Sequence, residues 1–221
     1  METIGVLSGI GHLPVEVAKS AKALGYQVVA IGVVPDIDEE LAECADFYYD
    51  INIGKIGKII STLKKHKVQQ VTMIGKVTKE VLYKAGKIVP DLRAIKILAT
   101  IPDRKDDTIM NAIVKELEGD GIKVMDQTVL IKPLLPTPGV LTKRKPTEEE
   151  LADMEFGFTM AKAIGGLDIG QTVVVKNRAV MAVEAIEGTD ACILRGGFLG
   201  KGGVIVRSEE RRVGKECRSR W

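Results

Sequence analysis

Residues 1–131 alternate between short apolar runs and segments with helical spacing, and this alternation limits the fold more than any other feature of the sequence. The apolar runs have the length of buried strands and are bounded by glycine or charged residues. We expect strands at 3–7, 27–34, 47–51, 68–74 and 122–125, and helices at 14–24, 36–44, 55–66, 92–100 and 106–118. The pattern predicts an α/β fold, with a Rossmann-like N-terminal domain built on a parallel sheet.

A proline-rich stretch, residues 132–146, interrupts the alternation and is typical of a linker. After it we expect a second, incomplete α+β domain over residues 147–206, which would be the catalytic one. Its expected elements are a capped helix at 147–164, hairpin strands at 171–175 and 179–184, a helix start at 188–190, a glycine-rich segment at 196–203 and a strand at 204–206.

Composition excludes several classes of protein. The chain has 221 residues, with 32 Lys and Arg against 30 Asp and Glu and only 4% aromatic residues. A charge this close to zero and so few rings for base stacking argue against nucleic acid as a partner. No apolar run approaches the roughly 18 residues of a membrane span. The residues after Met1 do not have the basic and apolar pattern of a signal peptide, so we expect the chain not to be secreted.

The few cysteines and histidines limit the chemistry further. Cys44, Cys192 and Cys217 are odd in number and form no Cys-x-x-Cys pair, so neither a zinc site nor a disulfide framework is expected. His12 and His66 are the only histidines, which disfavours a Ser-His-Asp or Cys-His nucleophile.

Three glycine- or lysine-containing loops follow expected strands, where an open parallel sheet binds its ligands. They are Gly9–Pro14, Gly54–Lys58 and Gly75–Lys76, and together they could form a cationic cradle for a phosphorylated ligand. The candidate substrate- or phosphate-binding residues in them are Gly9, Gly11, His12, Lys55, Lys58 and Lys76.

Each loop taken alone is equally typical of an ordinary turn. Pro14 stands where the dinucleotide fingerprint has its third glycine, and no Walker sequence is present. These departures make a nicotinamide enzyme or a P-loop ATPase less favoured than another nucleotide site.

Two groups of acidic residues complete the candidates. Asp106 and Asp107 could cap a helix, or they could bind a sugar hydroxyl or Mg²⁺. The second group consists of Asp168, Glu184, Glu187 and Asp190. Its carboxylates suit Mg²⁺ and phosphate chemistry, although helix capping and pairing with Lys or Arg explain them equally well.

Five segments, taken in order, resemble the LpxI-type UDP-2,3-diacylglucosamine pyrophosphatases. The most specific is the run Glu-Ala-Ile-Glu-Gly-Thr-Asp at 184–190. The segments are Gly5–Pro14, Gly54–Lys58, Asp106–Asp107, Leu167–Gln171 and Val183–Ala191.

The resemblance implies Mg²⁺-dependent hydrolysis of the pyrophosphate of UDP-2,3-diacylglucosamine to UMP and 2,3-diacylglucosamine 1-phosphate (lipid X), a step of lipid A synthesis. It also implies an amphiphilic UDP-sugar lipid substrate and peripheral contact with the cytoplasmic face of the bacterial inner membrane, and it leaves a homo-oligomer open. The candidate catalytic residues are Glu187, Thr189 and Asp190, and the metal ligands stay unassigned.

Residues 207–221 depart from the family. They match, residue for residue, the translation of a short-read sequencing adapter, so we expect them not to be native. A basic tail that binds anionic lipid is the alternative. The family continues beyond this point with an Asp-rich motif that supplies catalytic acids and metal ligands, and this chain has none. We therefore expect residues 1–221 to be a truncated chain, inactive alone or poorly folded in the second domain.

Two further functions stay open. A Rossmann-like protein could bind a nucleotide or lipid carrier without turning it over, or it could be a dinucleotide-dependent oxidoreductase. Metal-dependent turnover of a UDP-sugar lipid distinguishes the first from the hydrolase, and stabilisation by NAD or NADP would favour the second.

Overall fold

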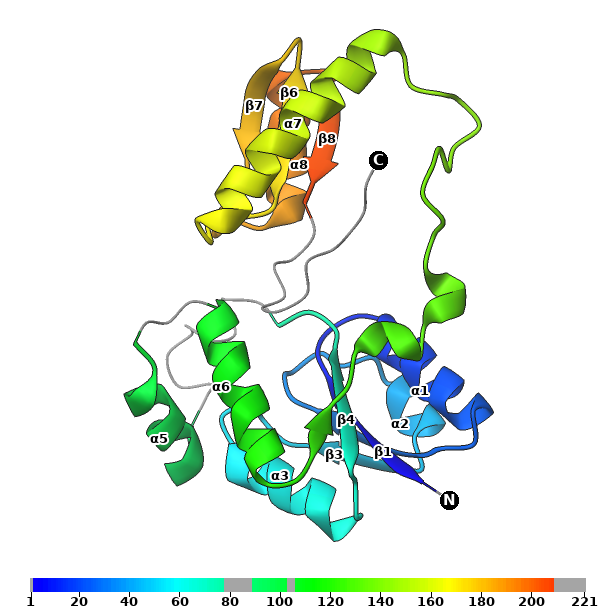
Figure 1. Cartoon of the computed structure of the whole chain (residues 1–221), viewed down its shortest axis with the longest axis vertical. Coiled ribbons are helices and arrows are strands. Elements are labelled where there is room, and N and C mark those ends of the chain that lie inside the picture. The colour runs from blue at the N-terminus through cyan, green and yellow to red at the C-terminus, as the bar shows by residue number, and fades with distance from the viewer. Residues whose placement is uncertain (1, 78–88, 103–105, 209–221) are drawn as a thin grey trace. The chain divides into compact units, whose positions relative to one another are not determined.

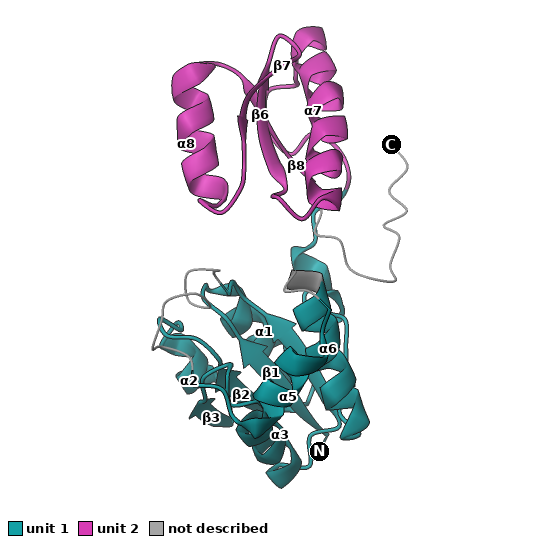
Figure 2. Cartoon of the chain, turned by 90° about the vertical axis from the view of Figure 1, so that its left-hand side faces the viewer, with its two compact units in different colours: residues 1–104, 108–137 teal, residues 105–107, 138–221 magenta. Residues whose placement is uncertain are grey.

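A computed structural model of the chain describes residues 2–77, 89–102 and 106–208. The chain divides into two compact units, which Figure 2 shows in different colours. Unit 1 consists of residues 1–104 and 108–137, and unit 2 of residues 105–107 and 138–221. The division at 137/138 falls inside the proline-rich stretch.

Unit 1 contains a five-stranded parallel sheet with the strand order β3-β2-β1-β4-β5. This order is that of a doubly wound Rossmann-like sheet, so the predicted fold class is confirmed. The strands are β1 (Thr3–Ser8), β2 (Gln27–Gly32), β3 (Phe47–Asp50), β4 (Gln70–Ile74) and β5 (Lys123–Val124).

Helices cover both faces of this sheet, as Figure 1 shows: α3, α5 and α6 lie on one side, α1 and α2 on the other. They are α1 (Leu13–Ala23), α2 (Glu40–Cys44), α3 (Ile56–Lys65), α5 (Leu92–Thr100) and α6 (Asp106–Gly119), followed by the 3₁₀ helices η1 (Gln127–Val129) and η2 (Lys132–Leu134).

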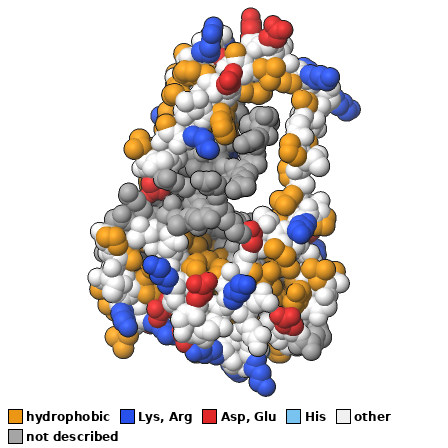
Figure 3. Space-filling model, in the orientation of Figure 1, with side chains coloured by type: hydrophobic (Ala, Val, Ile, Leu, Met, Phe, Trp, Pro, Cys, Tyr) orange, Lys and Arg blue, Asp and Glu red, His pale blue; other side chains and the backbone are white. Residues whose placement is uncertain are grey.

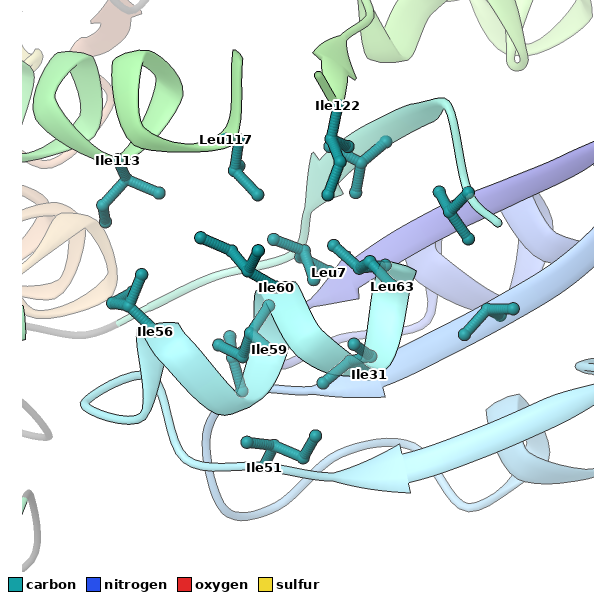
Figure 4. Packing of buried hydrophobic residues seen from close by; sticks show 14 of the residues in the cluster. Leu7, Ile31, Ile51, Ile56, Ile59, Ile60, Leu63, Ile113, Leu117 and Ile122 are labelled. Carbon is teal, nitrogen blue, oxygen red and sulfur yellow. The ribbon is translucent and has the colours of Figure 1, made fainter. Parts of the chain in front are cut away.

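Strand alternation produces the two cores of unit 1. In β2, Val29 and Ile31 point to the α3 face, whereas Val28 and Ala30 point to the α1 face, and all four are fully buried. Figure 4 shows the first core, in which isoleucine and leucine side chains of α3 meet those of the strands and α6. Because both faces are covered, the strands are apolar almost throughout.

Unit 2 is a three-stranded antiparallel sheet, in the order β7-β6-β8, between two helices. Val173 and Val175 face α7, and Val174 faces α8. The elements are α7 (Glu148–Gly166), β6 (Thr172–Lys176), β7 (Ala179–Val183), α8 (Thr189–Leu199) and β8 (Val204–Arg207).

Glycines let both helices approach this sheet closely. A Cβ at Gly157 of α7 would lie 2.6 Å from Val206 Cγ2, and one at Gly196 of α8 would lie 2.4 Å from Val174 Cγ2. The glycine-rich segment expected at 196–203 therefore begins inside a helix. Gly196 lies in α8 and allows this helix to pack closely against the sheet.

Most elements differ from the expected ranges by one or two residues at an end, and two differences are informative. Helix α2 begins at Glu40 and not at residue 36, because Asp36 has a left-handed backbone (φ 65°) that a helix does not allow. Strand β8 includes Arg207, the first residue of the segment expected not to be native; residues 209–221 lie outside the described residues. Among the described residues, no helix is long and apolar enough to cross a membrane.

Candidate functional site

The loops after β1 and β4 meet at the point where the strand order reverses, which is where open α/β sheets bind ligands. The amide of Gly9 donates to Ile74 O (2.8 Å), and Ile10 and Lys76 exchange two backbone hydrogen bonds of 2.9 and 2.8 Å. Lys76 is exposed beside this bridge. Two of the three predicted loops are therefore brought together.

Gly9 and Gly75 are needed for this contact. A Cβ at Gly9 would lie 2.7 Å from Lys76 O, and one at Gly75, whose φ is +98°, would lie 2.7 Å from the Gly9 carbonyl carbon. Gly11 has a φ of +113°, and a Cβ there would meet nothing within 4 Å. Close backbone packing is enough to explain why residue 9 is a glycine, without a ligand. The positive φ explains why residue 11 is a glycine.

His12 lies just before α1 among carboxylates and not among cations. Its Nδ1 is 2.9 Å from Asp38 Oδ2 and 3.9 Å from Glu40 Oε2, and its Nε2 is 3.3 Å from Glu16 Oε1. The hydrogen bond with Asp38 raises the pKa of His12 and lowers that of Asp38. Lys19 pairs with Glu40 at 2.6 Å. The local charge disfavours a phosphate directly on His12.

The third loop lies at the β3 edge of the sheet. Lys55 precedes the first residue of α3 and is half-buried, and Lys58 is exposed one turn later. The amide of Gly57 donates to Asp91 Oδ2 at 2.7 Å, so a carboxylate of the chain already occupies this helix N-terminus. Strand β3 is separated from β1 by β2, which corresponds to about 10 Å at the usual strand spacing. The structure therefore does not gather all three loops at one point.

Asp106 and Asp107 are the first two residues of α6. This position is compatible with helix capping. Their side chains lie outside the described part of the structure, so neither of their two predicted roles is decided.

In unit 2, Glu184 is the centre of a hydrogen-bond network at the start of α8. Its Oε1 accepts from Thr189 Oγ1 at 2.8 Å, and its Oε2 accepts from the Gln171 amide at 3.2 Å. Burial alone would raise its pKa, but the hydrogen bonds from Thr172, Thr189 and the Gln171 amide outweigh burial and lower it. Arg207 donates to Thr189 Oγ1 at 2.6 Å and lies 3.8 Å from Glu184 Oε2. Glu184 and Thr189 are thus engaged in holding this loop together.

Glu187 and Asp190 differ in what they contact. Glu187 accepts from the Ala185 amide (3.1 Å) and from Arg195 Nη2 (2.9 Å), and the same arginine nitrogen also donates to Val183 O. Asp190, in the first turn of α8, is exposed, and no hydrogen bond or ion pair of its side chain is seen in the described part of the chain. Of the three predicted catalytic residues, Asp190 offers a carboxylate free to bind.

Asp168 has a structural role. It follows α7 with a left-handed φ of 58°, and its amide and that of Ile169 donate to Gly165 O and Ile164 O, which closes the end of the helix.

Three carboxylates that the sequence did not single out make structural contacts. Asp38 contacts His12, Asp91 joins two helices, and buried Asp153 accepts from the amides of Asn177 and Arg178 in the β6–β7 turn (2.9 and 2.6 Å). Only Asp91 had a local signal, because it directly precedes an expected helix.

A hollow of about 390 Å³ lies at the amino-terminal ends of the strands of unit 1, away from the predicted loops. Its lining is polar and includes one ring: Glu2, Thr3, Gln27, His66, Lys67 and Gln69. None of the predicted site residues lines it.

On the face that Figure 3 shows, Lys and Arg side chains are interspersed with Asp and Glu. No large basic patch covers the described residues of that face. The expectation that nucleic acid is not a partner stays a prediction.

Comparison with known proteins gives matches over almost the whole chain. The family profile of the LpxI N-terminal domain matches residues 3–134, and that of the LpxI C-terminal domain matches residues 137–216. UDP-2,3-diacylglucosamine pyrophosphatase LpxI from Caulobacter vibrioides is 32% identical over 219 residues, which cover 97% of this chain and 75% of the relative.

Solved structures are more distant. UDP-glucose 4-epimerase from Thermotoga maritima is 15% identical, with a TM-score of 0.37 over 54% of this chain and 35% of its own. Phosphoribosylglycinamide synthetase from Anaerococcus prevotii is 12% identical, with a TM-score of 0.32 over 92% and 44%. The chain spans less than half of either protein, and likeness at this level carries no argument about function.

Proposed function

The chain belongs to the LpxI family, and from that premise we propose that it hydrolyses the pyrophosphate bond of UDP-2,3-diacylglucosamine to UMP and 2,3-diacylglucosamine 1-phosphate. One observation carries the proposal. Both family domains match in order, and a relative named for this activity is 32% identical over 97% of the chain.

The residues present suit hydrolysis by water. Cleavage of a phosphorus anhydride needs no serine or cysteine nucleophile, and its transition state is stabilised mainly by positioning and by cations near the developing charge. We propose that the lysines that follow β3 and β4 contribute to binding the phosphate or nucleotide part of the substrate. Lys76 is exposed where the strand order reverses, and Lys55 and Lys58 lie at the start of α3.

Asp190 is the residue we assign to the metal. Mg²⁺ is usually held by one or two carboxylates together with substrate phosphates and water. Asp190 fits this use because its carboxylate is exposed and makes no hydrogen bond or ion pair in the described part of the chain, whereas Glu184 and Glu187 accept hydrogen bonds from their own unit. When bound, Mg²⁺ supplies charge neutralisation on the pyrophosphate. Glu187 and Thr189 then act by positioning the loop that carries Asp190.

The same proposal includes where the protein works. A substrate with two acyl chains and a UDP group requires access to a lipid surface, so we propose peripheral action at the cytoplasmic face of the inner membrane in lipid A synthesis.

The experiment compares turnover with binding. UMP release from UDP-2,3-diacylglucosamine is measured by mass spectrometry with Mg²⁺ and with EDTA. Two chains are assayed: residues 1–221, and an extended chain in which the segment after Val206 is taken from the Caulobacter relative. Metal-dependent UMP release by the extended chain supports the hydrolase, and binding without turnover by both chains supports the non-catalytic alternative. Equal activity of the two chains would show that the expectation of inactivity is wrong.

A melting experiment addresses the oxidoreductase alternative. A ligand present at 100 times its Kd stabilises a protein by about 2.7 kcal/mol. We expect no shift in the melting temperature with NAD or NADP, and a clear rise with either would favour the dinucleotide enzyme.

A further inference from the structure

Three side chains from two segments of unit 1 bring ligand atoms together beside the β1 loop. His12 precedes α1, Asp38 follows β2, and Glu40 begins α2. One nitrogen or oxygen of each lies within 4.8 Å of the others. That is close enough for one ion to contact all three after small side-chain movements.

The two carboxylates are each held by the oxygen that faces away from His12. Asp38 Oδ1 accepts from the Glu40 amide at 3.1 Å, and Glu40 Oε1 pairs with Lys19 Nζ at 2.6 Å. Their other oxygens, Asp38 Oδ2 and Glu40 Oε2, point toward His12 Nδ1. Such outer contacts orient metal ligands in advance and lower the cost of assembling a site.

The imidazole is oriented in the same way. Its Nδ1 donates a hydrogen bond to Asp38 Oδ2 at 2.9 Å, and its Nε2 lies 3.3 Å from Glu16 Oε1. A metal ion would take the place of the Nδ1 proton, and the neutral ring would then keep its proton on Nε2, beside Glu16. A carboxylate that accepts from the far nitrogen of a metal-binding histidine is a common arrangement.

The local charge favours a cation. Glu16, Asp38 and Glu40 bring three negative charges and Lys19 brings one positive charge, so a neutral His12 leaves an excess of two negative charges. The His12 side chain is 54% exposed, so an ion can enter without opening the fold.

We propose that His12 Nδ1, Asp38 Oδ2 and Glu40 Oε2 bind a divalent transition-metal ion of the Zn²⁺ or Mn²⁺ class, with water at the remaining positions. An imidazole nitrogen beside carboxylate oxygens suits these ions better than Mg²⁺. This site does not include Asp190, and the proposal does not depend on the proposed hydrolysis. The proton of His12 and the Lys19 ammonium group compete with the metal ion for the Asp38 and Glu40 carboxylates.

The test uses the 221-residue chain and the metals alone. Its two histidines give separate imidazole signals in nitrogen-edited NMR, and His66 lies outside the cluster. Mn²⁺, which binds thiolates poorly, should broaden the His12 signals selectively, and Zn²⁺ should shift them. Calorimetry then measures the affinity for each ion.

Two variants and one control complete the experiment. His12→Gln and Asp38→Asn should each weaken Mn²⁺ binding at least about tenfold, and His66→Gln should leave it unchanged. Circular dichroism checks that all three variants fold. The proposal is overturned if neither ion affects the His12 signals, or if binding persists in both His12→Gln and Asp38→Asn.

Discussion

The Asp91 carboxylate accepts the Gly57 amide at 2.7 Å through Oδ2 and the Ala94 amide at 2.9 Å through Oδ1. One side chain therefore caps α3 and α5 at once, and the Asp91 amide also donates to Gly54 O at 2.9 Å. Because free amides and the helix dipole attract an anion, the start of α3 has an internal partner before any ligand arrives.

Replacing Asp91 should destabilise unit 1. Asp91→Ala removes two capping hydrogen bonds, each typically worth about 1 kcal/mol, so we expect a loss of about 1–3 kcal/mol in urea unfolding. Glu39→Ala is the matched control, because Glu39 stands at the N-cap of α2 without a capping hydrogen bond. An equal effect of the two substitutions would contradict the double cap.

Two neighbouring glycines of α8 should respond to alanine in opposite ways. Gly196→Ala places a Cβ 2.4 Å from Val174 Cγ2, and overpacking of this kind costs about 1–3 kcal/mol. Gly197→Ala meets nothing within 4 Å and should stabilise the helix by up to about 1 kcal/mol. Thermal unfolding followed by circular dichroism measures both; changes of the same sign would count against the close packing of α8.

The lowered pKa of Glu150 predicts that the free energy of unfolding depends on pH. Hydrogen bonds from Arg144 and the Thr147 amide lower the pKa of Glu150 from 4.5 to about 2. The stabilisation is therefore full above pH 4.5 and is lost as the pH falls toward 2. The melting temperature of the wild type should exceed that of Glu150→Gln above pH 5, with a gap that closes at low pH. Arg144→Gln should show the same closing gap, and a gap independent of pH would rule out this pair.

Asp190 should matter for turnover and not for folding. In the extended chain we expect Asp190→Asn to lower kcat at least about 100-fold with an unchanged melting temperature, because its side chain is exposed. Glu149→Gln removes the same charge from the first turn of α7 and should retain activity. Equal losses in the two variants would remove the assigned role of Asp190.

The fold could be predicted because its signals are local. Apolar runs such as 27–34 and the spacing of Ile56, Ile59, Ile60 and Leu63 in α3 depend only on which faces are buried, so strands and helices were predicted to within a few residues. The late start of α2 follows from the left-handed backbone of Asp36, which no periodicity shows.

The site was less predictable because its contacts join distant segments. His12 and Asp38 are 26 residues apart and meet because β1 and β2 are neighbours, and Gly57 and Asp91 are 34 apart. The sequence indicated which loops lie at the carboxyl edge of the sheet. It could not show that carboxylates of the chain occupy two of the expected anion sites.

The most direct test of the proposed function identifies the phosphorus products of the extended chain with UDP-2,3-diacylglucosamine and Mg²⁺. We expect ³¹P NMR to show UMP and 2,3-diacylglucosamine 1-phosphate forming in equal amounts as the pyrophosphate signals disappear. Formation of UDP and a free sugar lipid, or an unchanged substrate spectrum, would contradict pyrophosphate hydrolysis.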